Sequence, residues 1–178
     1  MQFRPTALSG AFVIELEPVA DERGFFARAF SRQEFESLGL VPDVSQANLS
    51  FNRRRGTVRG FHFQAPPAAE AKLIRCIRGA MHVVVVDART STPGYLRHVA
   101  VELSAENRLA VYVPPECATA MQTLADNTEA YYQVSAPYTP ELERGMRHDD
   151  PVLAVHWPLP VTEISAKDRA WPLLERGS

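Results

Sequence analysis

The sequence predicts an all-β protein, an antiparallel sandwich or barrel with a few short helices. Short apolar or alternating runs recur along the chain, and turn residues separate them at regular spacing. The 14 prolines and 9 glycines among 178 residues supply those turns. Such spacing is typical of antiparallel sandwiches and barrels, and a barrel of this type can hold one small ligand. Without a repeat or a linker, residues 1–178 are expected to form a single domain.

Composition excludes several classes of protein. The content is 46% hydrophobic and 22% charged with a net charge of -2, so nothing favours nucleic acid or an anionic membrane as a partner. No apolar run approaches the roughly 20 residues of a membrane span, and Met1–Pro5 lacks a signal-peptide core. Cys76 and Cys117 occur in apolar contexts and are expected to be reduced core residues. We therefore expect a cytoplasmic protein.

The first third of the chain predicts two apolar segments around a polar turn. Phe12–Leu16 alternates as a strand does, Asp21–Gly24 is polar and ends in glycine, and Phe25–Phe30 is apolar again. These residues predict two extended segments joined by a turn.

A short helix is expected next. Ser31 and Glu34 have the spacing of a capping box, in which the serine caps the helix and the glutamate reaches back. Phe35 and Leu38 would then share one helical face, and Gly39 suits the end of the helix.

Residues 44–51 read as an extended segment with an unusual polar face. In a strand, Gln46, Asn48 and Ser50 point to the same side. This face is either solvated or the hydrogen-bonding wall of a pocket. The basic loop 53–55 that follows is either solvated or attracts a phosphate ligand.

The most distinctive stretch is Thr57–Gln64, a β-like run that carries both charge and imidazole. Strict alternation places His62 and Gln64 on one face and Arg59 on the other. Both His62 and Arg59 can serve one site only if the strand bulges near Gly60, and glycine within a strand commonly marks a bulge. The alternative is a half-buried strand in which a backbone carbonyl satisfies His62.

The remaining chain predicts more strands, an irregular segment and a terminal helix. Tyr131 and Tyr132 are adjacent on one strand, so only one of them can face a barrel interior. Segment 137–160 has no periodicity, and Ser165–Asp168 opens a short helix with Asp168 at a position that suits the helix dipole. The continuous apolar character of 81–87 indicates burial on both faces. Strands are expected at 71–78, 81–87, 96–103, 108–113, 117–124 and 128–135.

Three kinds of chemistry are compared. A metal-binding barrel needs clustered ligands, but His62 has no histidine partner at ligand spacing, so no metal is expected. No serine or cysteine has the glycine context of a nucleophile elbow, which disfavours a hydrolase. Proton transfer beside a carbonyl needs a base, a carboxylate that orients it, a cation and an acid. The candidates for these roles are His62, Asp168, Lys72 and Tyr132.

Several motifs occur in an order that resembles one known family across nearly the whole chain. Together they look like the dTDP-4-dehydrorhamnose 3,5-epimerase family. The motifs are Asp21–Phe26, Gln46–Ser50, Val58–Gln64, Ala71–Leu73, Tyr132, Glu143–Gly145 and Ser165–Arg169.

The resemblance implies a fold, a substrate class and an assembly. The fold would be a metal-free, cupin-type antiparallel jelly roll without a cofactor, in a homodimer with strand exchange. The substrate would be a nucleotide sugar of the dTDP-4-keto-6-deoxy-glucose type, whose C3 and C5 protons are acidified by the C4 ketone. An epimerase would invert these carbons on the way to dTDP-rhamnose or a related deoxysugar.

The resemblance also implies roles for individual residues. His62 would be the base, Asp168 would fix its tautomer, and Tyr132 would return a proton from the opposite face. Lys72 would stabilise the oxyanion, and Arg59 would help to hold the keto sugar and its charge. The nucleotide site would be lined by Gln46, Asn48, Tyr138 and Glu143, with Arg23 and Phe26 contributed by the partner subunit.

Three positions depart from the family pattern. Thr119 stands in the substrate site where the family usually has histidine, Arg28 where it has glutamate, and His148 where it has tryptophan. Threonine cannot carry a charge, and arginine cannot accept a hydrogen bond from a base. Two alternatives to a 3,5-epimerase therefore stay open: a single-centre epimerase of another nucleotide sugar, and a non-catalytic barrel that binds sugar nucleotides.

Overall fold

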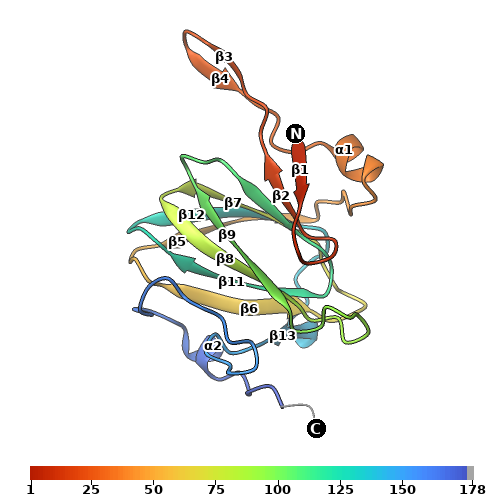
Figure 1. The fold of residues 1–178 in the computed structure, drawn as a ribbon, viewed down its shortest axis with the longest axis vertical. Helices are drawn as coiled ribbons and strands as arrows, with labels where there is room; N and C mark the ends of the chain where they lie inside the picture. The colour runs from red at the N-terminus through yellow and green to blue at the C-terminus, as the bar shows by residue number, and fades with distance from the viewer. Residues whose placement is uncertain (176–178) are drawn as a thin grey trace.

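A computed structural model describes residues 1–175 as two antiparallel β-sheets that face each other, with a projecting hairpin at one end (Figure 1). The six-stranded sheet has the order β1-β2-β10-β7-β12-β5, and the five-stranded sheet has the order β13-β6-β11-β8-β9. The prediction of an all-β barrel of antiparallel strands is confirmed.

The strands are short, as the spacing of turn residues predicts. The six-stranded sheet contains β1 (Gln2–Pro5), β2 (Phe12–Glu15), β10 (Ala110–Val113), β7 (Lys72–Arg78), β12 (Thr128–Val134) and β5 (Gln46–Asn52). The five-stranded sheet contains β13 (Glu143–Gly145), β6 (Val58–Gln64), β11 (Cys117–Thr123), β8 (Ala80–Asp87) and β9 (His98–Ser104). The hairpin, which we call the arm, consists of β3 (Val19–Asp21) and β4 (Gly24–Phe26).

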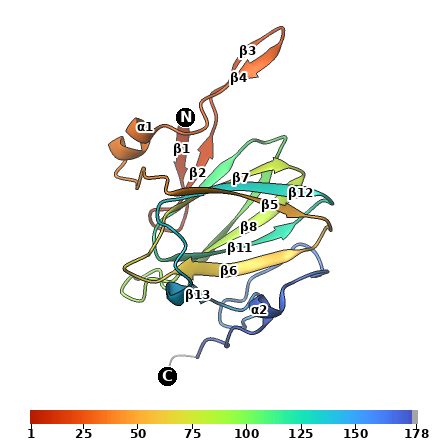
Figure 2. The same ribbon diagram turned by 180° about the vertical axis from the view of Figure 1, so that it is seen from behind.

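The helices are α1 (Arg32–Ser37), the 3₁₀ turn η1 (Pro140–Leu142) and α2 (Ala166–Arg169). α2 packs beside β6, at the end of the molecule opposite the arm (Figures 1 and 2). Within residues 1–175, no helix combines the length and the apolar character needed to cross a membrane.

The first helix starts as expected, but two of its predicted details are wrong. Ser31 caps it by accepting a hydrogen bond from the backbone N–H of Glu34 at 3.4 Å. The Glu34 carboxylate does not reach back to the cap; it accepts a hydrogen bond from the Met1 ammonium at 2.9 Å. Phe35 is buried against the barrel, whereas Leu38 is at the helix end and 47% exposed. Glu34 thus pairs with the N-terminal ammonium and not with the helix cap. The spacing of Ser31 and Glu34 in the sequence does not reveal this pairing.

Three strands were missed in the sequence, namely β1, β3 and β13, and β1 and β13 lack a strong β pattern. β1 is an edge strand that contains Pro5, a residue confined to such positions in sheets. β13 has the sequence Glu-Arg-Gly and lies in the segment expected to be irregular. Its pairing with β6, in which Gly145 is opposite His62, makes it a strand.

The core confirms that residues 81–87 are buried on both faces. Met81, Val83 and Val85 of β8 belong to the cluster between the two sheets. Val84 and Val86 point to the other side, into a cluster with the segment that contains Leu153 and Trp157.

Cys76 and Cys117 are free, buried thiols, as the sequence predicts. Burial raises the pKa of each to about 11, so both carry their proton at neutral pH. They act as core residues between the sheets.

The predicted bulge in β6 is present at Gly60. Thr119 of β11 is opposite His62 and Met121 is opposite Arg59, so two steps along β11 span three steps along β6. The extra residue changes the alternation, and both Arg59 and His62 thereby line one cavity. Gly60 has φ +105°, and a Cβ there would lie 2.4 Å from the carbonyl oxygen of Thr119.

Gly60→Ala should destabilise the protein strongly. The left-handed conformation costs an L-residue about 1–2 kcal/mol, and overpacking against backbone adds about 1–3 kcal/mol. We expect a loss of about 3 kcal/mol in the free energy of unfolding, measured by urea denaturation.

Gly39→Ala is the matched control. Gly39 also has positive φ, +68°, but its Cβ position has no atom within 4 Å. It should lose only the conformational part, about 1 kcal/mol. Equal losses for the two variants would show that the close approach of β6 and β11 is not a constraint.

Candidate active site

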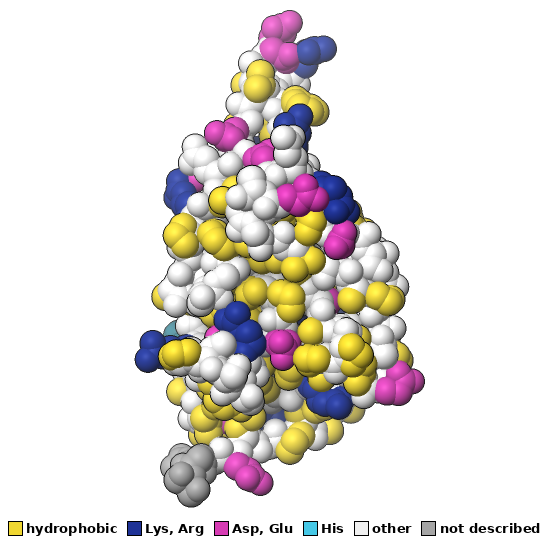
Figure 3. Space-filling model, turned by 90° about the vertical axis from the view of Figure 1, so that its right-hand side faces the viewer, with side chains coloured by type: hydrophobic (Ala, Val, Ile, Leu, Met, Phe, Trp, Pro, Cys, Tyr) yellow, Lys and Arg dark blue, Asp and Glu magenta, His cyan; other side chains and the backbone are white. Residues whose placement is uncertain are grey.

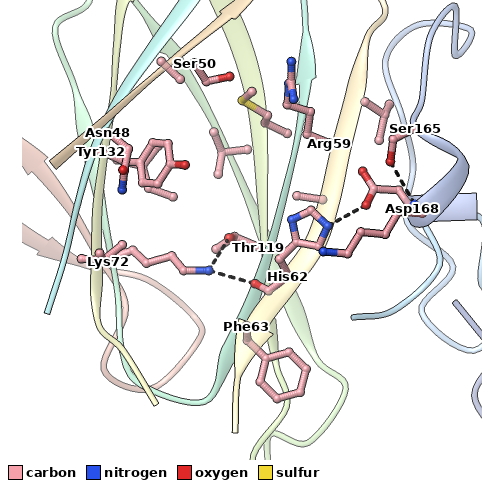
Figure 4. A pocket seen from close by; sticks show the side chains of 18 of the residues that line it. Asn48, Ser50, Arg59, His62, Phe63, Lys72, Thr119, Tyr132, Ser165 and Asp168 are labelled. Atoms are coloured by element: carbon pink, nitrogen blue, oxygen red, sulfur yellow. Dashed lines mark hydrogen bonds and ion pairs between the residues drawn. The ribbon is translucent and has the colours of Figure 1, made fainter. Parts of the chain in front are cut away.

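A cavity of about 1240 Å³ lies between the two sheets and is lined by both polar and apolar side chains (Figure 4). It contains every site residue expected from the sequence except Arg23 and Phe26. The polar face of β5 lines this pocket, as the pocket-wall alternative predicts. The expected residues that line the cavity are Gln46, Asn48, Arg59, His62, Lys72, Thr119, Tyr132, Tyr138, Glu143 and Asp168.

His62 and Asp168 form the central contact of the cavity. The Nε2 atom of His62 lies 2.6 Å from Oδ1 of Asp168, whose side chain is only 5% exposed. The other carboxylate oxygen accepts a hydrogen bond from the Gly60 N–H at 3.2 Å. Burial would raise the pKa of Asp168, but the hydrogen bond and charge of His62 outweigh it and hold that pKa below its ordinary value.

The C-terminal segment is tied to β6, which explains how residues 106 positions apart meet. Glu163 accepts a backbone hydrogen bond from Val58 at 2.8 Å, and Thr162 donates one to Gly56 at 3.0 Å. The buried side chain of Gln122 exchanges two hydrogen bonds with the backbone of Leu159. This anchored segment leads directly into α2, which carries Asp168.

The contact with Asp168 also determines which atom of His62 is available for chemistry. An ionised carboxylate only accepts hydrogen bonds, so Nε2 of His62 carries the hydrogen. In neutral imidazole Nδ1 is then an unprotonated acceptor. Nδ1 points into the cavity (Figure 4) and is positioned to take a proton from a bound ligand.

Tyr132 lies on the opposite side of the cavity from His62 (Figure 4). The adjacent Tyr131 is 37% exposed on the outer face of β12, as alternation requires. Burial raises the pKa of Tyr132, and the positive charge of Arg59 opposes that shift only in part. The phenol therefore keeps its proton at neutral pH and can donate it.

Lys72 is hydrogen-bonded to the backbone of His62. Its ammonium donates to the backbone oxygen of His62 at 2.9 Å and to Oγ1 of Thr119 at 3.3 Å. It also forms an ion pair with Glu70 at 3.1 Å. The nitrogen thus lies between β6 and β11, where a ligand oxygen could replace the hydroxyl of Thr119.

Arg59 is oriented by a residue that the sequence analysis missed. Its Nε donates to Oδ1 of the buried Asn52 at 2.6 Å, and Asn52 in turn donates to the backbone of Thr128. The alternating series Gln46, Asn48, Ser50 continues to Asn52, so strand periodicity would have found it.

A second polar group lies at the Tyr138 end of the cavity. Tyr138 donates to Oε2 of Glu143 at 2.7 Å, and Lys167 of α2 forms an ion pair with the same oxygen at 2.5 Å. Gln46 accepts the backbone N–H of Tyr138. The hydrogen bond to Glu143 raises the pKa of Tyr138. Lys167 was missed, although it is adjacent to Asp168 in the recognised motif.

Arg23 and Phe26 do not line the cavity. Both lie on the arm, which projects away from the barrel and carries apolar and charged side chains together (Figure 3). Phe26 is 73% exposed and Phe25 is 47% exposed. Arg28 is also exposed and follows the arm. His148 is distant from these residues in sequence, and its backbone oxygen accepts the indole N–H of Trp157.

No group of three or more His, Cys, Asp or Glu side chains in the described part of the chain is arranged to hold a metal ion. The absence of a metal requirement stays a prediction.

Fold and site together define a cupin-type jelly roll with paired acid and base groups across a polar pocket. A family model described as dTDP-4-dehydrorhamnose 3,5-epimerase matches residues 5–176. A relative from Sinorhizobium fredii with that name is 38% identical and aligns with 98% of this chain and 90% of its own. A Streptomyces niveus relative, 35% identical over 95% of this chain and 82% of its own, is named dTDP-4-dehydrorhamnose 3-epimerase.

Solved structures agree with the sequence relatives. The Bacillus anthracis dTDP-4-dehydrorhamnose 3,5-epimerase, crystallised with TDP and PPi bound, has a TM-score of 0.93 and 34% identity, covering 97% of this chain and 99% of that chain. The Legionella pneumophila enzyme in complex with dTDP-4-keto-L-rhamnose has a TM-score of 0.90 and 32% identity, covering 97% and 92%. The chain belongs to the dTDP-4-dehydrorhamnose 3,5-epimerase family of carbohydrate epimerases, so the recognised resemblance and the jelly-roll fold are confirmed.

The Asp168 contact should make stability depend on acid pH. Folding lowers the pKa of Asp168, so the ionised carboxylate stabilises the folded state. This contribution is fully present above the pKa of the group in the unfolded chain, near 4, and it is lost as pH falls through the lower pKa of the folded protein. Relative to Asp168→Asn, the wild type should be about 1–3 kcal/mol more stable at pH 5, and this advantage should shrink by pH 3.

Urea unfolding at the two pH values measures this difference. Glu106→Gln, at an exposed carboxylate, is the control and should leave stability nearly unchanged at both. An advantage for wild type over Asp168→Asn that is the same at pH 3 as at pH 5 would contradict an ionised Asp168 in the folded protein.

Proposed function

We propose that this chain is an epimerase that inverts C3 and C5 of dTDP-4-dehydro-6-deoxy-glucose, a step of dTDP-rhamnose or related deoxysugar biosynthesis. The observation that carries the proposal is the His62–Asp168 pair facing Tyr132 across one polar cavity. A pure binder does not need a base, an orienting carboxylate and an acid on opposite walls. Family membership supports the same conclusion.

In the proposed mechanism, the C4 ketone acidifies the protons on the neighbouring ring carbons. His62 removes one of these protons, the electron pair becomes the enolate, and the negative charge moves to the C4 oxygen. Tyr132 then gives its phenolic proton to the same carbon from the other face, which inverts the centre. Proton exchange with solvent restores neutral His62 and the phenol, so no cofactor or metal takes part.

Two cations are proposed to act on the developing charge. Lys72 would stabilise the C4 oxyanion by exchanging its bond to Thr119 for one to the ligand. Arg59, held by Asn52, would support the sugar and its charge from the same strand as His62.

The thymidine diphosphate is proposed to occupy the end of the cavity that contains Gln46, Asn48, Tyr138 and Glu143. The support is the group of hydrogen-bonding side chains there, together with the TDP and the dTDP-4-keto-L-rhamnose bound in the two solved relatives. We propose that Lys167 joins this group through Glu143.

A second copy of the chain is proposed to complete the site. Arg23 and Phe26 are on the arm, away from the cavity of their own subunit, and Phe26 is 73% exposed. An arm with such exposed aromatic residues suits docking into a partner subunit. A cytoplasmic location is also proposed, because two buried free thiols suit a reducing compartment.

His62→Ala and Tyr132→Phe should fail in different ways. Without its base, His62→Ala should lose about 10²–10⁴-fold in rate at both carbons. In Tyr132→Phe, His62 should still remove the first proton, so solvent deuterium should enter that carbon. The configuration of the carbon should not invert, because the phenolic proton is missing. The measurement is NMR of dTDP-4-dehydro-6-deoxy-glucose in deuterated water, with a chelator present.

Phe63→Leu on the same strand is the control for general damage to the pocket, because it changes no acid or base group. If His62→Ala exchanges deuterium near the wild-type rate, His62 is not the base. If wild type exchanges neither C3 nor C5, the non-catalytic sugar-nucleotide barrel becomes the better interpretation.

A single-centre epimerase is the second candidate, and Thr119 is the observation that favours it. The neutral Thr119 hydroxyl contacts Lys72 at 3.3 Å, where the family usually has a histidine that could donate a charged hydrogen bond. Charge-assisted hydrogen bonds are roughly twice as strong as neutral ones. C3 and C5 need different ring poses, so the less stabilised enolate should fail first at one of them.

Under this second candidate, wild type labels one carbon rapidly and Thr119→His restores label at the other. The same time-resolved NMR assay measures both, and GDP and CDP 4-keto sugars compared with the dTDP sugar test the effect of Arg28 on nucleotide choice. Rapid label at both carbons of the dTDP sugar in wild type, without preference for the other nucleotides, would show that Thr119 and Arg28 do not limit the reaction.

A further inference from the structure

Glu70 is a buried carboxylate on the wall of the cavity with one partner. Its side chain is 7% exposed and that of Lys72 is 10% exposed, and Oε1 of Glu70 lies 3.1 Å from the Lys72 nitrogen. The second oxygen, Oε2, is buried and has no hydrogen-bond partner in the described chain. A buried charge is costly unless it is paired, so Glu70 depends on Lys72 for its compensation.

Three oxygen atoms contact the Lys72 ammonium, one through an ion pair and two through hydrogen bonds. They are Glu70 Oε1 at 3.1 Å, the backbone oxygen of His62 at 2.9 Å and the hydroxyl of Thr119 at 3.3 Å. The Thr119 contact is the longest of the three, and its acceptor is an uncharged hydroxyl. A negatively charged ligand oxygen would therefore replace Thr119 more readily than it would replace Glu70 or the carbonyl.

The backbone around Glu70 is held between two strands. The Ala71 N–H donates to the hydroxyl of Ser135 at 2.8 Å, and the Ser135 N–H donates to the Ala71 oxygen at 3.0 Å. Lys72 starts β7 and pairs with Val134 and Val113 on either side. Glu70 is thus a fixed acceptor, suited to hold a flexible lysine in one direction.

We propose that Glu70 is a positioning residue for the reaction, which anchors the Lys72 ammonium so that its third N–H is presented to the substrate oxygen that becomes negative. This inference rests on the proposed function and adds a residue to it. Glu70 does not touch the reacting atoms. Glu70 acts by holding the four-carbon side chain of Lys72 in one rotamer.

The kinetic test is a double-mutant cycle with Glu70→Gln, Lys72→Met and the double variant, assayed by deuterium exchange into the keto sugar. Misplacement of a catalytic group by about 1 Å costs about 10²-fold, so Glu70→Gln should lose about 10–100-fold in kcat with KM within about threefold. Glu70→Asp, which keeps the charge, should recover part of this loss. Glu106→Gln removes an exposed carboxylate and should match wild type.

Comparison of the kcat losses in the single and double variants shows whether Glu70 acts through Lys72. If Glu70 acts through Lys72, the double variant should have the same kcat as Lys72→Met alone. Losses that multiply in the double variant would overturn the proposal, because Glu70 would then act independently. A Glu70→Gln enzyme with wild-type kcat and lower melting temperature would also overturn it, since the pair would be only structural. A wild-type protein that exchanges no label would instead remove the proposed function itself.

Urea unfolding of the same four proteins tests the pairing without relying on activity. Lys72→Met leaves the Glu70 carboxylate buried and unpaired, so adding Glu70→Gln should restore part of the lost stability. If the double variant is no more stable than Lys72→Met, Glu70 is not compensated by Lys72 and the proposal fails. Because this comparison uses the Lys72→Met background, it holds even if Glu70→Gln alone folds poorly.

Discussion

The 2.6 Å contact between His62 and Asp168 is the interaction on which the rest of the site depends. It needs three separate features of the fold. The bulge at Gly60 turns both Arg59 and His62 into the cavity, and the same Gly60 donates its N–H to Asp168. The C-terminal segment must run beside β6, which the backbone bonds of 162–163 secure. The Asp168 carboxylate fixes the tautomer of the His62 imidazole. The local change in strand register therefore decides which imidazole nitrogen can accept a proton from a ligand.

Three cations that line the cavity are each held by a defined partner. Lys72 is paired with Glu70, Lys167 with Glu143, and Arg59 with Asn52. Groups fixed in this way need little reorganisation when charge develops on a ligand, which is the condition under which protein dipoles and charges act most effectively. Polar partners also allow so many ionisable groups to lie inside a barrel of limited size.

One of the three positions that depart from the family pattern, Thr119, lines the cavity. Thr119 replaces an ionisable side chain by a hydroxyl, yet it keeps a polar acceptor within reach of Lys72. Arg28 follows the arm and does not line the cavity. The departures thus leave the His62–Asp168 pair and Tyr132 in place.

The sequence by itself determined most of the strand pattern, the two-sided burial of 81–87 and the polar face of β5, because alternation and turn chemistry are local. It also indicated that β6 must bulge near Gly60 if Arg59 and His62 serve one site. It also indicated the site residues, through motifs that resemble one family. It could not determine which distant groups meet. The strand β13 has no β propensity of its own, and Glu34 binds the N-terminus. Glu70 joins the site only because the side chain of Lys72 reaches the β6 backbone, and Lys167 joins it only because α2 packs beside β6. These features depend on contacts between residues far apart in the chain, which only the tertiary structure decides.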